Sequence, residues 1–539
     1  MTSSTKGTVS STKRTVASPS SARFAFATLL ATIVFGSATS ACGVFGSDDP
    51  AAPPAEDAQM PSRGTPNMDV GGPADPSELT DQFGVFVAPN GQPHTDGNHA
   101  RPAASIQDGI DLAKRVGKRV YVCAGTFHEQ ITLADSISII GGLDCTNNEW
   151  NIGKPGARTR IEAPKSPAVT ATNITSPTRL EGLDVVAPDA TAPSGSSIAL
   201  IADHAGTLTI AKSKLTAGNA MAGVDGGDGI QLKASPWDSQ PATTAAACAP
   251  NTTCTHIGFY YYKSAGAHGG TNTCIGAPSH AAEPGGDGGS GGLWQPVNDV
   301  SAYHFHPYQA DANKADPGVT RTAAPGADGT PGTNANEIGT ISRDGYVPAS
   351  GTAGADGAPG FGGSGGAGRT PEPDYDPNTA ALSGVWRGVG GAGGGPGGCP
   401  GLGGTPGKGG GASIAALLLE SPVAFEAAEI VSRSGGSGGL GAFGSAPTDG
   451  GPPGPNVYFP LTGGQYGGRG GAAGVSGNGA NGPSLGIAYA GTKPNVNADT
   501  KVTVGTAGAA IPARSRTTLG VTKTIPATSA GIAKDILGL

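Results

Sequence analysis

The sequence predicts an all-β fold in which short strands stack turn upon turn into a solenoid, with one helix near the amino terminus and long glycine-rich loop insertions. Short β-branched runs bounded by turn residues recur at a spacing of 19 positions, and a fixed period of about 20 with one strand per unit is typical of a solenoid. A longer apolar pattern recurs after Ser197, Ser413 and Ser484. The 539 residues include 93 Gly and 45 Pro, about a quarter of the chain, which is typical of low-complexity sequence.

Residues 1–41 have the features of a secretory signal peptide. An apolar run that ends at Phe35 follows three basic residues, Lys13, Arg14 and Arg23. Small residues then continue as far as Ala41. An apolar run of about 12 residues is too short to span about 30 Å of hydrocarbon, which favours export over a membrane-spanning helix. Residues 42–80 contain Pro, Ala and acidic residues with almost no large apolar side chain, so we expect a disordered tether.

The segment Thr39-Ser-Ala-Cys42 resembles the lipobox of bacterial lipoproteins. The resemblance implies that Cys42 is the lipid attachment site, that the membrane is a partner through this anchor, and that Gly43 directs the protein to the outer membrane. More than one acyl chain would anchor the protein firmly. Thr39 departs from the Leu that is usual at the first position, so processing by the general signal peptidase, which would leave a secreted soluble protein, stays open as the alternative.

Residues 81–218 are expected to form the amino-terminal part of the solenoid together with its capping helix. Ser105 is a suitable N-cap, Ile106, Ile110 and Ala113 fall on one face, and Gly117 ends the helix. Strands are expected at residues 119–123, 137–140, 159–162 and 178–181, because each is a short run rich in β-branched or apolar residues between turns.

Two of these strands are nearly identical in sequence, Thr159-Arg-Ile-Glu162 and Thr178-Arg-Leu-Glu181, and they lie 19 positions apart, as do Val120 and Ile139. We expect Ile161 and Leu180 to point inward and to stack about 4.8 Å apart on neighbouring turns. Because side chains alternate along a strand, the outward positions then form a row of alternating charges: Arg160, Glu162, Arg179 and Glu181.

Three later segments predict three further turns of the same stack. Each begins with Ser and a short apolar run, at Ser197, Ser413 and Ser484, and a second apolar residue follows 17 or 18 positions later, at Leu215, Ile430 and Val502. The glycine-rich tracts then lie at one corner of the stack. We divide the rest of the chain into a cysteine-containing, glycine-rich insertion (219–412), further turns with a glycine-rich loop (413–510) and a C-terminal tail (511–539).

The segment from Gly84 to Cys145 resembles the entry segment of right-handed parallel β-helix proteins of the pectin-lyase-like superfamily. The resemblance implies a right-handed parallel β-helix whose open amino-terminal end is covered by the helix. With its lipobox and glycine-rich tracts the chain also resembles myxobacterial surface lipoproteins labelled PE-PGRS-like, although it has no PE-type amino-terminal domain. The first resemblance is carried by Phe86-Val-Ala-Pro-Asn-Gly91, Ser105-Ile-Gln-Asp-Gly-Ile110, Val120-Tyr-Val-Cys-Ala-Gly-Thr-Phe-His-Glu129 and Ile139-Ile-Gly-Gly-Leu-Asp-Cys145.

Six cysteines follow Cys42, and an even number in an exported chain suggests disulfides. Spacing allows many pairings, of which we prefer Cys123–Cys145, Cys248–Cys254 and Cys274–Cys399. No Cys-x-x-Cys occurs, and the histidines lack metal-ligand spacing relative to the cysteines, so we expect no metal site and no cofactor.

The glycine-rich tracts are expected to be mobile loops, with only local extended polyglycine-like pairing. Gly recurs at every third position from Gly351 to Gly368, but these triplets are too few for a collagen triple helix. Ordering each residue costs roughly 1–2 kcal/mol, and Gly has no side chain with which to recover it. The aromatic residues between Ser235 and Val347, Tyr260–Tyr262 among them, favour a small satellite core over a ligand site.

We expect the protein to be a cell-surface structural or adhesive lipoprotein and not an enzyme, with extracellular polysaccharide or other surface proteins as partners. The net charge of −8 and the lack of a basic stripe exclude nucleic acid as a partner. Catalytic residues are not expected: Arg160 and Arg179 alternate with Glu162 and Glu181, and Asp203-His204 is an isolated pair. A polysaccharide-acting β-helix enzyme, lyase or hydrolase, and a glycan-binding module built on Tyr260–Tyr262 are the alternatives.

Overall fold

The computed structural model describes residues 71–146, 149–152, 156–241, 265–291, 315–336, 338–369, 373–375, 382–385, 390–455 and 463–539. All of these residues belong to one compact unit, Asn67–Leu539. The expected signal peptide, Cys42 and most of the tether lie outside the described residues, as do Cys248, Cys254 and Tyr260–Tyr262. Among the helices that are described, none combines the length and the apolar character needed to cross a membrane.

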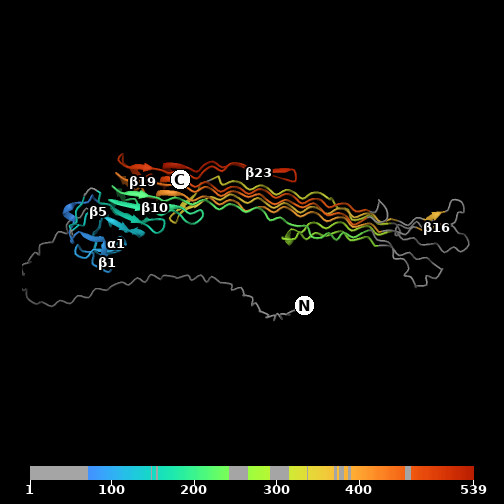
Figure 1. Cartoon of the computed structure of the whole chain (residues 1–539), viewed down its shortest axis with the longest axis horizontal. Coiled ribbons are helices and arrows are strands. Elements are labelled where there is room, and N and C mark those ends of the chain that lie inside the picture. The colour runs from blue at the N-terminus through green and yellow to red at the C-terminus, as the bar shows by residue number, and fades with distance from the viewer. Residues whose placement is uncertain are drawn as a thin grey trace, which may run out of the picture. The chain divides into compact units, whose positions relative to one another are not determined.

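Most strands belong to three parallel sheets, which lie at one end of the described chain, so the expected all-β class with parallel strands is confirmed (Figure 1). Sheet 1 contains β1 (Gly84–Gln92), β2 (Arg119–Cys123), β5 (Ile139–Leu143), β8 (Thr178–Glu181), β11 (Leu208–Ala211), β18 (Ala424–Glu426) and β21 (Asn495–Val496). Sheet 2 contains β3 (Gly125–Phe127), β6 (Thr159–Glu162), β9 (Leu183–Val186), β12 (Lys214–Thr216), β19 (Glu429–Val431) and β22 (Lys501–Thr503). Sheet 3 contains β4 (Ile131–Leu133), β7 (Val169–Thr172), β10 (Ser197–Asp203), β17 (Ser413–Leu419), β20 (Ser484–Ala490) and β25 (Ala533–Gly538).

The chain passes from sheet 1 to sheet 2 to sheet 3 and then returns to sheet 1. Short turns with a residue of positive φ make two of the three corners. Gly182 (φ 71°), Lys212 (φ 42°) and Ala427 (φ 48°) lie between sheets 1 and 2. His204 (φ 54°) and Glu420 (φ 47°) lie between sheets 3 and 1. A single left-handed residue bends the chain between two strands, so consecutive strands can belong to different sheets that share one interior.

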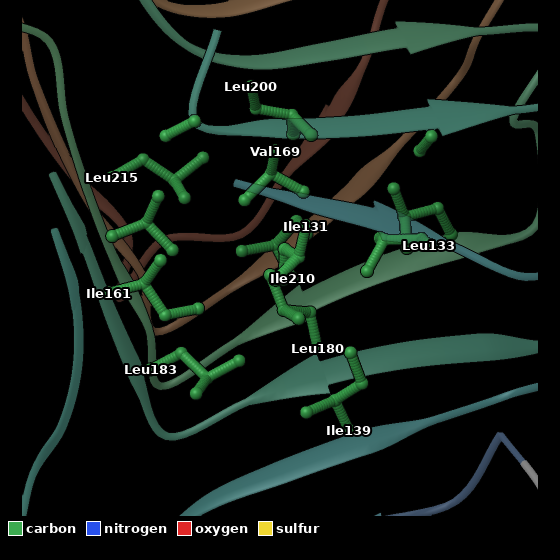
Figure 2. Packing of buried hydrophobic residues seen from close by; sticks show 14 of the residues in the cluster. Ile131, Leu133, Ile139, Ile161, Val169, Leu180, Leu183, Leu200, Ile210 and Leu215 are labelled. Atoms are coloured by element: carbon green, nitrogen blue, oxygen red, sulfur yellow. The ribbon is translucent and has the colours of Figure 1, made fainter. Parts of the chain in front are cut away.

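The interior is filled by inward side chains that stack in register from strand to strand (Figure 2). In sheet 1, Leu180 pairs with Ile139 on one side and Ile210 on the other, and Ile210 pairs with Phe425. All four side chains are fully buried. Burying such a side chain contributes about 1.5–3 kcal/mol relative to leaving it exposed, so these stacks are the main apolar contribution to the fold.

The expected stacking of Ile161 on Leu180 is wrong, because the two residues belong to different sheets. Ile161 lies in β6 and pairs with Phe127 and Val185 in sheet 2. The two strands are similar because both alternate inward and outward residues, not because they occupy equivalent turns. The pairing of Val120 with Ile139 is present.

The three turns that begin at Ser197, Ser413 and Ser484 are confirmed, since these serines pair in register in sheet 3. Their buried hydroxyls bind the chain where it leaves sheet 2. Ser413 Oγ donates to Gly218 O (2.8 Å) and accepts from the Arg433 N–H (2.8 Å). Both glycine-rich tracts leave at this corner, after β12 and β19, so the serines hold together the base of each insertion.

The glycine-rich tracts are ordered through hydrogen bonds between backbones, and the expectation of mobile loops is wrong for the described residues. Gly357, Gly360 and Gly363 donate to the carbonyls of Gly401 (2.9 Å), Gly398 (2.9 Å) and Gly395 (2.8 Å). Every third residue thus meets the same neighbour, as expected for extended chains with three residues per turn. We call the hydrogen-bonded chains of residues 217–241, 265–291, 315–336, 349–369, 390–412, 432–455 and 463–483 the glycine array; they run side by side (Figure 1).

Helix α1 (Ile106–Val116) has the expected caps and packs beside β1 and β2. Ser105 Oγ accepts from the Asp108 N–H (3.0 Å), and Gly117 adopts φ 66°. Ile106, Ile110 and Ala113 join the interior of the three sheets.

Residues 71–80 are part of the fold and not of the expected tether. They include the short helix η1 (Pro76–Glu78), whose Glu78 pairs with buried Arg119 (2.8 Å).

Antiparallel hairpins accompany these elements. The pairs are β13 (Gly339–Ser342) with β14 (Gly345–Pro348), β15 (Pro373–Tyr375) with β16 (Leu382–Val385), and β23 (Arg514–Thr518) with β24 (Val521–Ile525). A second short helix, η3, spans Pro278–His280. The first hairpin covers apolar side chains on the outer face of sheet 3 through Ile341 and Tyr346. The last hairpin and β25 lie in residues 511–539, so the segment described as a tail completes sheet 3.

Replacing Leu180 by Ala is expected to lower the free energy of unfolding by about 2–5 kcal/mol, because it opens a cavity in the middle of the sheet 1 stack. Chemical denaturation followed by circular dichroism measures the change. Val116→Ala is the control: this side chain is 57% exposed, so the change should stay within about 0.5 kcal/mol. Equal effects of the two substitutions would contradict the stacked interior.

Two neighbouring glycines test the close packing of the array. A methyl group at Gly226 would overlap the carbonyl oxygen of Thr405, whereas one at Gly227 would lie 3.7 Å from Thr405 Oγ1. We expect Gly226→Ala to destabilise the local array by about 1–3 kcal/mol through overpacking and to speed amide hydrogen exchange in residues 217–231. Gly227→Ala should leave exchange near the wild-type rate. Indistinguishable exchange in the two variants would be evidence against the array.

Candidate functional site

The outer face of sheet 2 carries a column of alternating charges. Parallel pairing places Arg160, Asp184, Lys214, Glu429 and Lys501 at one register position on five neighbouring strands. Arg160 Nη1 lies 2.9 Å from Asp184 Oδ2, and Lys214 Nζ lies 3.1 Å from Glu429 Oε2. We call this column the charge ladder; opposite charges on adjacent strands stabilise a sheet.

A second, more buried network lies on the outer face of sheet 1. Arg179 Nε lies 2.6 Å from Glu181 Oε2, and Arg179 Nη1 lies 2.9 Å from Glu426 Oε2. Lys212 Nζ is 2.8 Å from Glu181 Oε1. The side chains of Arg179 and Glu181 are only 7% exposed. They point away from the interior as expected, but neighbouring side chains cover them, so they form an ion-paired cluster rather than part of a solvent-facing ladder.

A polar recess of about 230 Å³ lies where sheets 1 and 2 meet, between the two networks. Arg158, Lys212 and Lys214 contribute positive charge, and Asp184 and Glu429 contribute negative charge. Because the two acidic groups already pair with Arg160 and Lys214, a ligand here would have to compete with ion pairs inside the protein. The recess can bind polar groups, but Asp184, Lys214 and Glu429 already take part in ion pairs within the protein.

Three carboxylates in or beside the networks, Glu162, Glu181 and Glu429, have lowered pKa values that favour the ionised form. Hydrogen bonds from Arg160 and Lys214 are the largest cause that lowers the pKa values of Glu162 and Glu429. Burial acts to raise the pKa of Glu181, but hydrogen bonds from Lys212 and Arg179 outweigh it, so this pKa is lowered too. A general acid needs a raised pKa near neutrality. These three carboxylates are therefore suited to ion pairing and not to donating a proton.

The carboxyl group of Glu129, which has a raised pKa, caps the beginning of helix α1. Burial is the largest cause that raises the pKa of Glu129. Its two oxygens accept from the backbone N–H groups of Ile106 (2.7 Å) and Gln107 (3.0 Å). These N–H groups have no partner within the helix. Glu129 therefore has a structural role, which joins α1 to the segment between β3 and β4.

The cysteines and the Asp203-His204 pair singled out in the sequence belong to neither of the two charged networks. Disulfides join Cys123 to Cys145 and Cys274 to Cys399, which match two of the three preferred pairings. His204 Nδ1 lies 2.8 Å from Asp203 Oδ1 at the corner between sheets 3 and 1. Within the part of the chain that the structure describes, no three His, Cys, Asp or Glu side chains gather closely enough to hold a metal ion.

Sequence reasoning missed most members of the two networks. Asp184, Lys214 and Glu429 lie in short strands. The insertion of residues 217–412 separates the strand of Lys214 from that of Glu429, so their register could not be assigned. The one available signal was alternation within each strand: each of these residues precedes an apolar residue that points inward.

No protein-family model, curated protein or solved structure matches this chain.

The buried network predicts a pH-dependent contribution to stability. Replacing Glu181 by Gln should lower the free energy of unfolding at neutral pH by roughly 1.5–3 kcal/mol, because Arg179 loses one charged partner but keeps Glu426. The pKa of Glu181 is lowered from 4.5 in the folded protein. This stability is therefore present above pH 4.5 and is lost as the pH falls through the lower folded value.

Thermal unfolding between pH 7 and pH 3 measures this effect. The difference between wild type and Glu181→Gln should shrink as the pH falls. Asp499→Asn, at an exposed position, is the control and should show little difference at neutral pH. A difference between wild type and Glu181→Gln that is constant or grows at acid pH would contradict the assignment.

Proposed function

We propose that the protein is an exported, non-catalytic structural or adhesive protein of the cell surface, anchored by lipid at Cys42. In this proposal the three parallel sheets form a right-handed parallel β-helix, with α1 covering its amino-terminal end. The β-helix is the rigid base, and the glycine array is the part that extends from it. Extracellular polysaccharide and other surface proteins are the partner classes that such a surface would meet.

The observation that carries this proposal is the continuity between sheet 3 and the glycine array. The chain runs from the array directly into β17 and into β20. Ser413 and Ser484 at these junctions hydrogen-bond the chain where it leaves sheet 2, at Gly218 and Arg433. Extended chains of this kind rise about 3.1 Å per residue, so the tract of residues 390–412 spans roughly 70 Å. A structure with this reach, held by backbone hydrogen bonds, suits a protein that presents a surface at a distance.

Two further observations support a structural role in an oxidising compartment. The disulfides Cys123–Cys145 and Cys274–Cys399 are of a kind that persists outside the cytosol. The paired carboxylates Glu162, Glu181 and Glu429 favour stabilisation of the sheets over acid–base chemistry, because their pKa values are lowered. These observations favour the structural role over the alternative of a polysaccharide-acting enzyme.

Lipid labelling in a diderm bacterium that expresses the full chain tests the proposal. Wild-type protein should incorporate labelled fatty acid, its mature amino terminus should be Cys42 by mass spectrometry, and external protease should digest it on intact cells. Cys42→Ser should lose the label, and Cys123→Ser is the matched control that should retain it. An unmodified Met1 terminus on a protein inside the cell would contradict export.

A second measurement separates the structural role from catalysis. Purified protein should release no products from a panel of neutral and acidic polysaccharides. Release of products that is abolished in Glu181→Gln, while that variant still folds, would instead support the polysaccharide-acting enzyme.

A further inference from the structure

A cavity of about 380 Å³ lies between the hairpin β23–β24 and the glycine array, and we call it the hairpin pocket. Its volume is within the range of small-molecule sites, about 300–1,000 Å³. The array contributes Phe443 and Val475, and the hairpin contributes Val521. The pocket therefore has apolar walls on both sides, although the surrounding chains consist mostly of glycine and small residues.

Three cationic side chains, Arg469, Arg516 and Lys523, line the same pocket. The Arg516 guanidinium lies 4.3 Å from the centre of the Phe443 ring and pairs with Asp228 (2.7 Å). Lys523 Nζ donates to Ala473 O (2.7 Å) and lies 3.6 Å from Asp328. These two cations join the hairpin to the array and are held in place.

Asp228 and Asp328 have a double role that explains why their cations are fixed. Asp228 Oδ1 accepts from the Phe443 N–H (2.9 Å), and Asp328 Oδ1 accepts from the Ala472 N–H (2.8 Å). The second oxygen of each carboxylate faces the cation from the hairpin. Both acids are thus held by the array. Arg516 makes a close ion pair with Asp228, whereas Lys523 is held mainly by its hydrogen bond to Ala473 O.

Arg469 differs from the other two cations because it has neither a short ion pair, as Arg516 has, nor a short hydrogen bond to a carbonyl, as Lys523 has. Its Nε lies 3.7 Å from Asp449 Oδ1, beyond hydrogen-bond distance, and the Asp449 side chain is 87% exposed. Arg469 Nε is itself buried and makes no hydrogen bond among the described residues. The Arg469 side chain as a whole is 33% exposed, so its charge is accessible from the pocket. An arriving carboxylate would give it a closer partner through a charge-assisted hydrogen bond.

We propose that the hairpin pocket binds a small organic anion in which a carboxylate is carried on an apolar or aromatic body. The carboxylate binds Arg469 in place of the loose contact with Asp449. The apolar body lies against Val521, which is 48% exposed, and against the small parts of Phe443 and Val475 that reach the pocket. The pocket takes one ring or a short chain, and Arg516 and Lys523 add favourable potential without giving up their own partners.

Isothermal titration calorimetry on the folded chain tests this proposal with benzoate and hexanoate, and with sulfate and galacturonate for comparison. We expect the two apolar carboxylates to bind more tightly than sulfate or galacturonate. Arg469→Gln should weaken their binding about ten- to a hundredfold, the usual effect of losing a charged hydrogen bond. Arg343→Gln is the matched control, because Arg343 is 74% exposed, pairs with Asp203 at 3.8 Å and does not line the pocket.

A second variant tests the apolar wall and does not depend on how Arg469→Gln folds. Val521→Ser should weaken benzoate several-fold and leave the weaker sulfate binding unchanged. The proposal is overturned if neither carboxylate binds at millimolar concentration, if Arg469→Gln binds as wild type does, or if sulfate binds as tightly as benzoate. Equal loss of both carboxylates in the Arg343→Gln control would also overturn it, because binding would then lie elsewhere.

Discussion

Constant register between neighbouring backbones is the constraint on which the whole structure depends. In the sheets, side chains alternate between two faces, so a slip of one residue would exchange the inward and outward sets. Such a slip in β9 would move Val185 out of the interior and bring the Asp184 carboxylate into it. The stacked core and the charge ladder are thus two results of the same pairing, and neither could form without the other.

The glycine array follows the same rule with a period of three in place of two. Ordering glycine costs more backbone entropy than ordering any other residue, and side-chain packing cannot repay it here. Close approach of the chains allows each carbonyl to meet a neighbouring N–H, as between Gly471 and Ala358 (2.8 Å). The serine contacts at the base fix where each tract starts and ends, so part of the ordering cost is already met by the sheets.

Local signals in the sequence were reliable where the structure depends on local contacts. The caps at Ser105 and Gly117 predicted α1, and the repeated pattern at Ser197, Ser413 and Ser484 predicted three paired strands, because each signal lies within one element. The match between the strands of Ile161 and Leu180 failed, since alternation says which side of a strand faces inward but not which sheet it joins. Mobility was predicted for the glycine tracts because their hydrogen bonds connect residues that are far apart in the sequence. Arg469 carries no local signal at all, and its setting exists only once the hairpin has packed on the array.

The triplet spacing of the array also governs how its length can change over time. Gly326, Gly329 and Gly332 donate to three carbonyls on the neighbouring chain that are spaced by the same interval. Gain or loss of a whole triplet keeps glycine at the positions that contact the neighbouring backbone. Gain or loss of one or two residues would place larger side chains at these positions, where there is no room for a Cβ atom. Insertions and deletions in the array are therefore compatible with its packing when they span whole triplets.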